Sequence, residues 1–226
     1  MISGIDVASY QSETYPTSGL DFVLIKATEG KKYVNPKMAR QAATARTAGL
    51  VVGFYHFLHT GDIKAQAAYF VEKAVSLEGD LLVCDWETPP GGRGASNAEK
   101  DAFLAEVKRL RPGHRVGLYC NRDYWLNRDN TSQAGDFLWI ADPGKAGFPH
   151  IKAKWRIHQY KIDGGTDRNV ADFTSRAAMR EWAGYPASKP TPRPPAPKPT
   201  EPTLQSLNKR VTDLEKVVAA LQKKVG

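Results

Sequence analysis

Residues 50–85 read LVVGFYHFLHTGDIKAQAAYFVEKAVSLEGDLLVCD and contain two short apolar segments with an amphipathic segment between them. The segments Leu50–Tyr55 and Leu81–Asp85 have the length of strands and are too apolar for a sheet with one face in water. Asp62 is a good N-cap for a helix that runs to about Ser76. A buried strand, a helix and a second buried strand make a βαβ unit, which predicts a mainly parallel sheet.

The same alternation of strands and helices extends over residues 1–186. Further helices are expected over Asn35–Gly49, with a proline in the first turn, over Ser96–Leu110, which opens with a capping box, and over Phe173–Trp182. The other expected strands are Ile2–Val7, Phe22–Lys26, Val116–Cys120, Phe137–Ile140 and Trp155–Tyr160, with a short one near Val170.

Strands in this order can form an open doubly wound sheet or a closed barrel. No GxGxxG motif and no P-loop follows any of them, and polar residues gather at the strand ends, which favours the barrel. Eight complete βα units need more than 186 residues, so some helices have to be missing. The sequence therefore predicts an α/β fold, an irregular barrel of about eight strands with missing helices.

The composition changes sharply after Gly184. Residues 187–202 contain seven prolines in sixteen residues, so we expect a stiff extended linker over 187–203. In residues 204–226, Val at a positions and Leu at d positions repeat over three heptads, which favours a parallel two-stranded coiled coil. We expect this segment to join two chains in a homodimer. The alternative is a single amphipathic helix docked on the main domain.

The overall composition excludes several classes of protein. The 226 residues are 41% hydrophobic and 25% charged, which is typical of a globular protein. No apolar run reaches 18 residues, so no membrane span is expected, and the N-terminus lacks the basic and apolar regions of a signal peptide. Two cysteines, Cys84 and Cys120, without CxxC spacing predict buried thiols rather than a disulfide scaffold or a zinc site.

The charge balance points to an anionic partner. The net charge is +8, and residues 187–226 contribute +5 of it through eight Lys/Arg and three Asp/Glu. Such a balance favours a cell-wall polymer, a nucleic acid or a membrane surface. The sequence has no nucleic-acid-binding motif, so we expect no nucleic-acid partner.

Paired carboxylates stand at the end of the strand that finishes at Asp85. Asp85 and Glu87 are two residues apart, so both project from the same face of the strand end. Like charges at close range raise the pKa of one group and leave the other ionised, which is what glycoside hydrolysis needs. Asp6 ends the first strand where no helix begins, and Asp167 follows the seventh strand, so both are expected near the pair.

Aromatic and polar residues occupy the other strand ends and form the predicted substrate-binding set. The aromatic residues would offer flat faces to sugar rings, and the polar ones would bind the rim of the sugar. This set is Tyr55, Trp86, Trp139 and Tyr160, with Glu29, Asp142 and Gln159. We expect no cofactor and no metal.

Nine segments carry a resemblance to a known family. They are GIDVASYQ (4–11), FVLIKATEG (22–30), AGLVVGFYHF (48–57), QAAYF (66–70), LLVCDWE (81–87), GLYCNRDYW (117–125), LWIAD (138–142), HQY (158–160) and GTDRNVADF (165–173). In order and spacing these segments resemble glycoside hydrolase family 25, the lysozymes of the Chalaropsis type.

The resemblance implies a flattened barrel that hydrolyses the β-1,4 bond between N-acetylmuramic acid and N-acetylglucosamine in bacterial peptidoglycan. By motif, it implies that Glu87 is the general acid, that Asp85 is the second acid of the pair, and that Asp6 and Asp167 accompany them. Attack by water and assistance from the substrate's own acetamido group both stay open. Relatives of this size are often phage endolysins, which are made in the host cytosol without a signal peptide and reach the wall when a holin opens the membrane.

Three alternatives stay open at this stage. Lys26 at a strand end could form a Schiff base in a lyase. His56 and His59 are three residues apart and could bind zinc, although no third ligand is evident. The chain could also be a catalytically silent wall-binding or virion protein that keeps the fold.

Overall fold

The computed structural model describes residues 1–162 and 165–185. These residues belong to one compact unit, Met1–Ala187. The predicted linker and coiled coil, 187–203 and 204–226, lie outside the described residues. No helix within the described part of the chain is long and apolar enough to cross a membrane.

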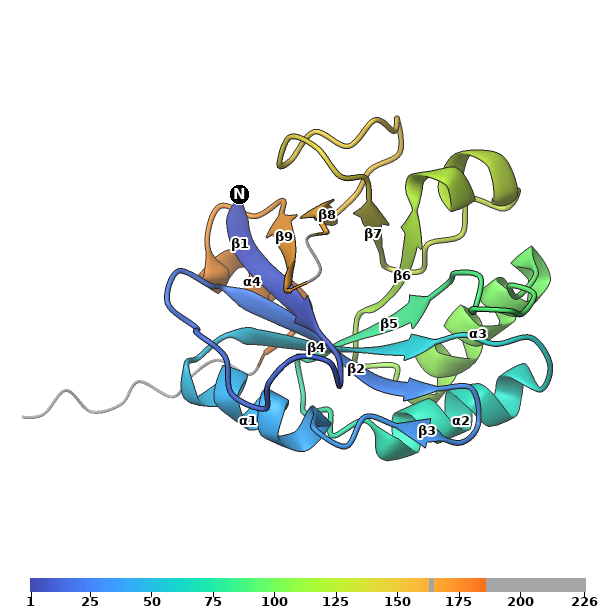
Figure 1. The fold of residues 1–226 in the computed structure, drawn as a ribbon, viewed down its shortest axis with the longest axis horizontal. Coiled ribbons are helices and arrows are strands. Elements are labelled where there is room, and N and C mark those ends of the chain that lie inside the picture. The colour runs from blue at the N-terminus through green and yellow to red at the C-terminus, as the bar shows by residue number, and fades with distance from the viewer. Residues whose placement is uncertain (163–164, 186–226) are drawn as a thin grey trace, which may run out of the picture. The chain divides into compact units, whose positions relative to one another are not determined.

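Strands and helices alternate along most of the described chain (Figure 1). The strands are β1 (Ile2–Val7), β2 (Phe22–Glu29), β3 (Tyr33–Val34), β4 (Val51–Phe57), β5 (Leu81–Asp85), β6 (Val116–Asn121), β7 (Phe137–Ala141), β8 (Ile157–Lys161) and β9 (Asp167–Ala171). The helices are α1 (Met38–Thr47), α2 (Ile63–Lys73), α3 (Asn97–Leu110) and α4 (Arg176–Ala183), with one turn of π-helix, η1 (Tyr124–Arg128).

The sheet closes on itself because β1 is hydrogen-bonded on both sides. The strand order is β1-β9-β8-β7-β6-β5-β4-β2, and β1 also pairs with β2. The pairing of β1 with β2 is parallel and places Gly4 opposite Phe22, whereas its pairing with β9 is antiparallel and places Asp6 opposite Asp167. The predicted α/β barrel of eight strands is confirmed, and β3 adds only a short antiparallel ribbon beside β2.

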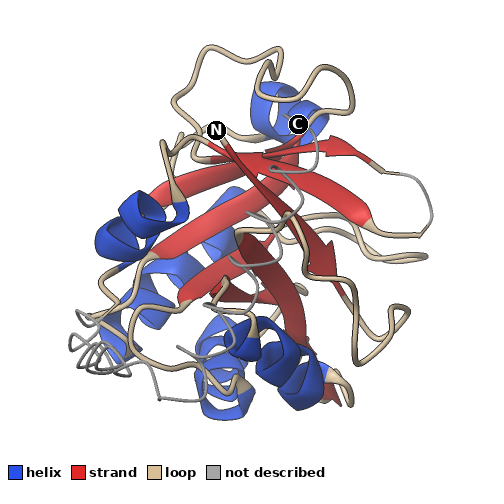
Figure 2. Ribbon diagram, turned by 90° about the vertical axis from the view of Figure 1, so that its left-hand side faces the viewer, coloured by secondary structure: helices blue, strands red, loops and turns tan. Residues whose placement is uncertain are grey.

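The helices cover only part of the barrel, as the sequence predicted. They lie outside the strands (Figure 2), with α1 against β2 and β4, α2 against β2, and α3 against β5 and β6. No helix lies among the described residues that connect β7, β8 and β9 (Figure 1). The shortage of residues for eight βα units is therefore met by omitting helices in the second half of the barrel.

Side chains alternate between the inside of the barrel and its outer face. On β5, Leu81 and Val83 pack in the inner cluster, and Leu82 and Cys84 pack in the outer cluster beneath the helices. Large inner side chains need small neighbours, since a Cβ at Gly117 would lie 2.5 Å from the ring of Phe137. The same alternation decides where the functional side chains point.

Helix α4 packs on the end of the barrel where the strands begin. Its Met179 and Ala183 are buried in the inner cluster together with Ile2 and Phe22. Beyond the helix, Tyr185 Oη accepts a hydrogen bond from the backbone N–H of Val52 on β4 at 2.9 Å. A functional site is therefore expected at the opposite end, where the parallel strands finish.

Capping side chains mark where the helices begin. Asp62 accepts a hydrogen bond from the N–H of Ala65, and Ser96 forms the predicted capping box with Glu99. Helix α1 begins at Met38 rather than at the predicted proline, because the side chain of Asn35 accepts from the N–H of Lys37 and holds a turn before the helix. The last helix begins after Ser175, three residues later than Phe173.

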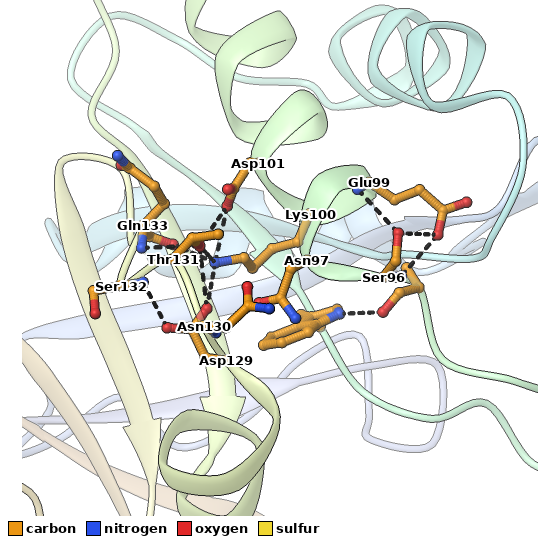
Figure 3. Close-up of polar contacts among 12 residues, drawn as sticks. Ser96, Asn97, Glu99, Lys100, Asp101, Asp129, Asn130, Thr131, Ser132 and Gln133 are labelled. Atoms are coloured by element: carbon orange, nitrogen blue, oxygen red, sulfur yellow. Dashed lines mark hydrogen bonds and ion pairs between the residues drawn. The ribbon is translucent and has the colours of Figure 1, made fainter.

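The fully buried Lys100 ties α3 to the loop that follows η1 (Figure 3). Its Nζ donates to Asp129 Oδ1 at 2.7 Å, to Thr131 Oγ1 at 2.9 Å and to the carbonyl of Gln133 at 2.9 Å. It also lies 5.2 Å from the ring centre of Trp86. One ammonium group thus satisfies three acceptors and fixes the connection between β6 and β7.

Replacing Lys100 with Met should destabilise the fold by roughly 3–5 kcal/mol, because the change leaves Asp129 buried without its cation. The free energy of unfolding from urea denaturation measures this cost. The control is Lys73→Met, since Lys73 is 40% exposed and pairs with its exposed neighbour Glu72, so its loss should cost far less than that of Lys100. Equal costs for the two variants would show that the Lys100 contacts carry no special stability.

Candidate active site

Acidic side chains from three strands meet at the carboxyl end of the barrel. Asp6 lies near the end of β1, and Asp85 ends β5 with Glu87 just beyond it. Asp167 is the first residue of β9, but β9 runs antiparallel to its neighbours, so its first residue lies at this same end. The topology therefore brings the four predicted acids to one end of the barrel.

Asp6 is buried and is held by two amides. Its Oδ2 accepts from Gln159 Nε2 at 2.8 Å and from Asn169 Nδ2 at 2.7 Å. Burial raises the pKa of Asp6 to about 7, although the two hydrogen bonds act in the opposite direction. The nearby charges of Asp167 and Glu87 raise it further.

Asp85 and Glu87 form a coupled pair. Asp85 points into the barrel, as the alternation of β5 requires, and Glu87 stays partly accessible at the rim. Burial raises the pKa of both carboxyls, and the charge of Glu87 raises that of Asp85 further, whereas Lys26 lowers both. Because the two negative charges repel each other, the pair retains a proton at a pH where isolated carboxyls have lost theirs.

Two phenols and an indole form the floor beneath these acids. The ring of Trp139 lies 4.3 Å from that of Tyr119 and 6.0 Å from that of Tyr55, measured between centroids. Burial, followed by the charges of the acids above them, raises the pKa of both tyrosines well above the ordinary value. Trp139 Nε1 donates to Asn169 Oδ1, and Tyr119 Oη donates to Gln159 Oε1, so the floor orients the two amides that hold Asp6.

Tyr119 and Asn169 are absent from the predicted site set, although the signal for both was present. Tyr119 is two residues before Asn121, the last residue of β6, and therefore faces inward like Asp85 on the neighbouring strand. Asn169 is two residues after Asp167 on β9 and shares its face. Asn169 donates a hydrogen bond to Asp6, and Tyr119 orients Gln159, the other amide that donates to Asp6.

The placement of Trp86 does not fit the predicted role of a sugar platform. It follows Asp85 and so points outward, where it is 1% exposed, packs edge-on against Tyr124 and donates from Nε1 to the carbonyl of Ala95. Trp139 is inside the barrel but only 2% exposed, so it supports the site from below. Tyr160 at the end of β8 is half-buried and keeps an accessible surface.

Glu29 and Asp142 are at the same end of the barrel, but both are held by cations. Glu29 accepts from Lys26 at 2.6 Å and from His59 at 3.0 Å, and these partners lower its pKa although burial acts in the opposite direction. The amine of Lys26 is thus engaged by Glu29 rather than free to attack a carbonyl, which argues against the lyase alternative.

Asp142 follows β7 and is bonded to His150 and Arg122. The hydrogen bonds from His150 and the charge of Arg122 lower its pKa, against the effect of burial. Asp142 is therefore an ionised carboxylate held by His150 and Arg122.

His56, one of the two histidines considered for a zinc site, is part of the packing between the barrel and its helices. His56 is fully buried on the outer face, where Nδ1 lies 2.7 Å from Thr28 Oγ1 and the ring stacks on Phe103. Burial lowers the pKa of His56 to about 3, so the ring is neutral. Across residues 1–162 and 165–185, no three His, Cys, Asp or Glu side chains are placed to hold a metal ion.

A closed, mainly parallel barrel that gathers carboxyl groups with raised pKa values at the carboxyl end of its parallel strands has the site of a glycoside hydrolase. The sequence profile of the glycosyl hydrolases family 25 matches residues 5–167. The chain belongs to this family, the N-acetylmuramidases or lysozymes.

Curated relatives and solved structures agree with this assignment. An N,O-diacetylmuramidase from Chalaropsis sp is 30% identical over 152 residues, which cover 59% of this chain and 72% of that protein. A lysozyme of Lactococcus phage mv1 is 28% identical over 201 residues, or 81% of this chain and 89% of that protein. The crystal structure of a bacterial lysozyme from Streptomyces coelicolor is similar with a TM-score of 0.70 and 26% identity, covering 81% of this chain and 97% of that one.

The raised pKa of Asp6 predicts a stability that falls as the pH rises. The pKa of Asp6 is about 7 in the folded chain, and its ordinary value is 3.8. Between about pH 4 and 7, Asp6 is therefore protonated in the folded chain and ionised in the unfolded chain, so stability is lost as the pH rises through this range. Asp6→Asn should therefore gain stability relative to the wild type between pH 4 and 7.5, by as much as roughly 4 kcal/mol.

Urea denaturation at the two pH values measures this gain. Asp172→Asn is the matched control, because Asp172 is 63% exposed and lies 3.8 Å from its only ion-pair partner in the described chain, Arg156. A difference between wild type and Asp6→Asn that does not change with pH would contradict the raised pKa.

Proposed function

We propose that the chain cleaves the β-1,4 bond between N-acetylmuramic acid and N-acetylglucosamine in peptidoglycan, with Glu87 as the general acid. The observation that carries this proposal is the pair of Asp85 and Glu87, a partly accessible carboxyl beside a buried one at the end of β5. Burial raises the pKa of both groups, and the charge of Glu87 raises that of Asp85 further. The proton of Glu87 passes to the leaving glycosidic oxygen as its bond to the anomeric carbon breaks. A water molecule then completes the hydrolysis and returns a proton to Glu87.

Asp85 is proposed to stabilise the positive charge that develops on the sugar or to orient its acetamido group. Its Oδ1 is buried and has no hydrogen-bond partner among the described residues, so this oxygen can accept from a substrate N–H or a nucleophilic water. Asp6 and Asp167 are proposed to raise the pKa of the pair and to hold the sugar. Both lie within electrostatic range, because Asp167 raises the pKa of Glu87 and Asp6 that of Asp85.

We further propose that the enzyme serves in host lysis as a phage endolysin. The similarity to a phage lysozyme over 89% of that protein's length supports this role. The enzyme would act at the bacterial cell wall after passage through a holin-opened membrane. The catalytically silent wall-binding protein is the competing proposal, and a direct assay separates the two.

The segment 204–226 is proposed to form a parallel dimer, so that two catalytic domains engage one wall. Its support is the heptad pattern of Val and Leu described above. Two linked sites gain avidity without any new contact, because the second binding event becomes intramolecular.

Glu87→Gln should lower the rate on purified peptidoglycan by about 10²–10⁴-fold, because it removes the transferable proton with little change of shape. Release of reducing sugars, with mass spectrometry to identify muramic acid at the new reducing end, measures the effect. Glu72→Gln on α2 is the matched control, since Glu72 is 68% exposed and should be dispensable. Binding to walls without sugar release by either form of residue 87 would favour the silent protein instead.

Sedimentation velocity tests the proposed coil. The full chain should sediment as a dimer at micromolar concentration, and a chain that ends at residue 186 should sediment as a monomer. Monomers in both samples would exclude dimerisation through 204–226.

A further inference from the structure

A pocket lies at the carboxyl end of the barrel, where β6 and β7 finish. It has a volume of about 450 Å³ and lies between η1 and the connection from β7 to β8. Its lining includes Asn121, Arg122, Leu126, Asp142 and His150. None of the four catalytic acids belongs to this lining, so the site described above does not account for the pocket.

The strand order places two lining residues of this pocket on strands close to the one that carries the catalytic pair. Strands β5, β6 and β7 are consecutive neighbours, and the backbone N–H of Trp86 donates to the carbonyl of Tyr119. Asn121 and Asp142 stand at the ends of β6 and β7, one and two strands away from the end of β5. Strands in a sheet are about 4.8 Å apart, so the backbones at these two positions lie about 5 and 10 Å along the sheet from the end of β5.

The polar groups of the pocket present a guanidinium to solvent. Arg122 is 48% exposed, and its Nη1 contacts Asp142 Oδ1 at 3.1 Å and His150 Nδ1 at 3.5 Å. Within the described residues, Nε and Nη2 of Arg122 make no hydrogen bond. Asp142 therefore anchors the arginine at one nitrogen and leaves donors that can bind a carboxylate.

The connection from β7 to β8 adds basic side chains. After Asp142, residues 143–156 of the connection from β7 to β8 contain four Lys or Arg residues and no Asp or Glu, and Arg156 among them pairs with Asp172. Three of these lysines, Lys145, Lys152 and Lys154, are exposed. This side of the site attracts anions, whereas the cluster of carboxyls at the centre repels them.

We propose that this pocket binds the carboxylate-bearing peptide that branches from the muramic acid residue of the substrate, with Arg122 as its main anchor. The inference rests on the proposed function and adds a specificity determinant to it. In peptidoglycan the peptide is attached through the lactyl group of the sugar whose glycosidic bond is cleaved, so it must leave the cleft beside the catalytic pair. A pocket of 450 Å³ falls within the range that accommodates small ligands.

The test compares kcat/KM on two substrates prepared from the same sacculi, with teichoic acid removed by acid treatment. One substrate keeps its peptides, and the other has lost them to an N-acetylmuramoyl-L-alanine amidase. The wild type should prefer the peptide-bearing substrate. Arg122→Ala should reduce that preference about ten-fold, and Arg122→Lys, which keeps the charge, should retain most of it.

Two controls separate this effect from a structural one. Arg109 on α3 is exposed and pairs with Glu106, so Arg109→Ala removes a paired surface arginine and should leave the preference unchanged. Thermal unfolding is measured for every Arg122 variant, because the buried Asp142 loses one of its two basic partners in Arg122→Ala. Arg122→Lys keeps that charge and should unfold close to the wild type, so a loss of preference caused only by instability would not follow the charge at residue 122. Arg122→Glu should reduce the preference further than Arg122→Ala.

Three results would overturn the proposal. The first is a wild type that shows no preference between the two substrates, and the second is a preference that Arg122→Ala leaves intact. The third is an effect of Arg122→Ala that appears only on walls that retain teichoic acid, which would assign the positive charge to a phosphate polymer. Failure of the wild type to release sugar from either substrate is distinct, because it would remove the proposed function together with this inference.

Discussion

The organisation of this protein depends on keeping several carboxyl groups buried close together at one end of a closed barrel. Isolated charges in such a place are costly, so each group either binds a proton or finds a partner. Asp6 does both, with a raised pKa and two amide donors from neighbouring strands. Those amides are themselves oriented by Tyr119 and Trp139 on the barrel floor, so the aromatic packing below and the acid chemistry above form one hydrogen-bonded unit.

The cations of the barrel mouth are distributed unevenly around this unit. Lys26 acts on both members of the catalytic pair, yet it is bonded to Glu29, which limits its effect. Arg122 and His150 are bonded to Asp142 further along the rim. The central acids consequently keep their raised pKa values, because no basic side chain among the described residues forms a direct ion pair with Asp6, Asp85 or Glu87.

Much of the fold follows from local sequence patterns, and the remainder depends on contacts distant in sequence. Ile2–Val7 and Leu81–Asp85 were predicted with their observed bounds. Leu81–Asp85 is an apolar run that ends in a polar residue, and in Ile2–Val7 apolar residues recur up to the last position. β2 and β4 extend beyond the predicted ends, since Thr28 and His56 bond to each other and bury polar groups that local sequence marks as a strand end. The π-helical turn depends on a contact of Tyr124 with Thr88 across 36 residues, which no local pattern contains.

The site divides in the same way. The spacing of Asp85 and Glu87 predicted a shared face, and the chemistry of the pair followed from it. Trp86 shows the limit of that reasoning, because a residue between two inward carboxylates must point outward, and the prediction assigned it by type rather than by position. Tyr119 was missed because its position was not considered: it lies beside Asp85 on the neighbouring strand and faces the inside of the barrel.

The double pairing of β1 also has a consequence for the order in which the chain folds. Its partner β9 is about 165 residues away in sequence, so contacts between the two strands cannot form until most of the domain has left the ribosome. At 5–20 residues per second, that delay is roughly 8–30 seconds. Strands β2 to β8 can pair progressively during this time as an open sheet, but Asp6 receives the amide of Asn169 only at closure. The nascent chain therefore carries its acids unassembled, and the catalytic centre is completed as a late step of synthesis.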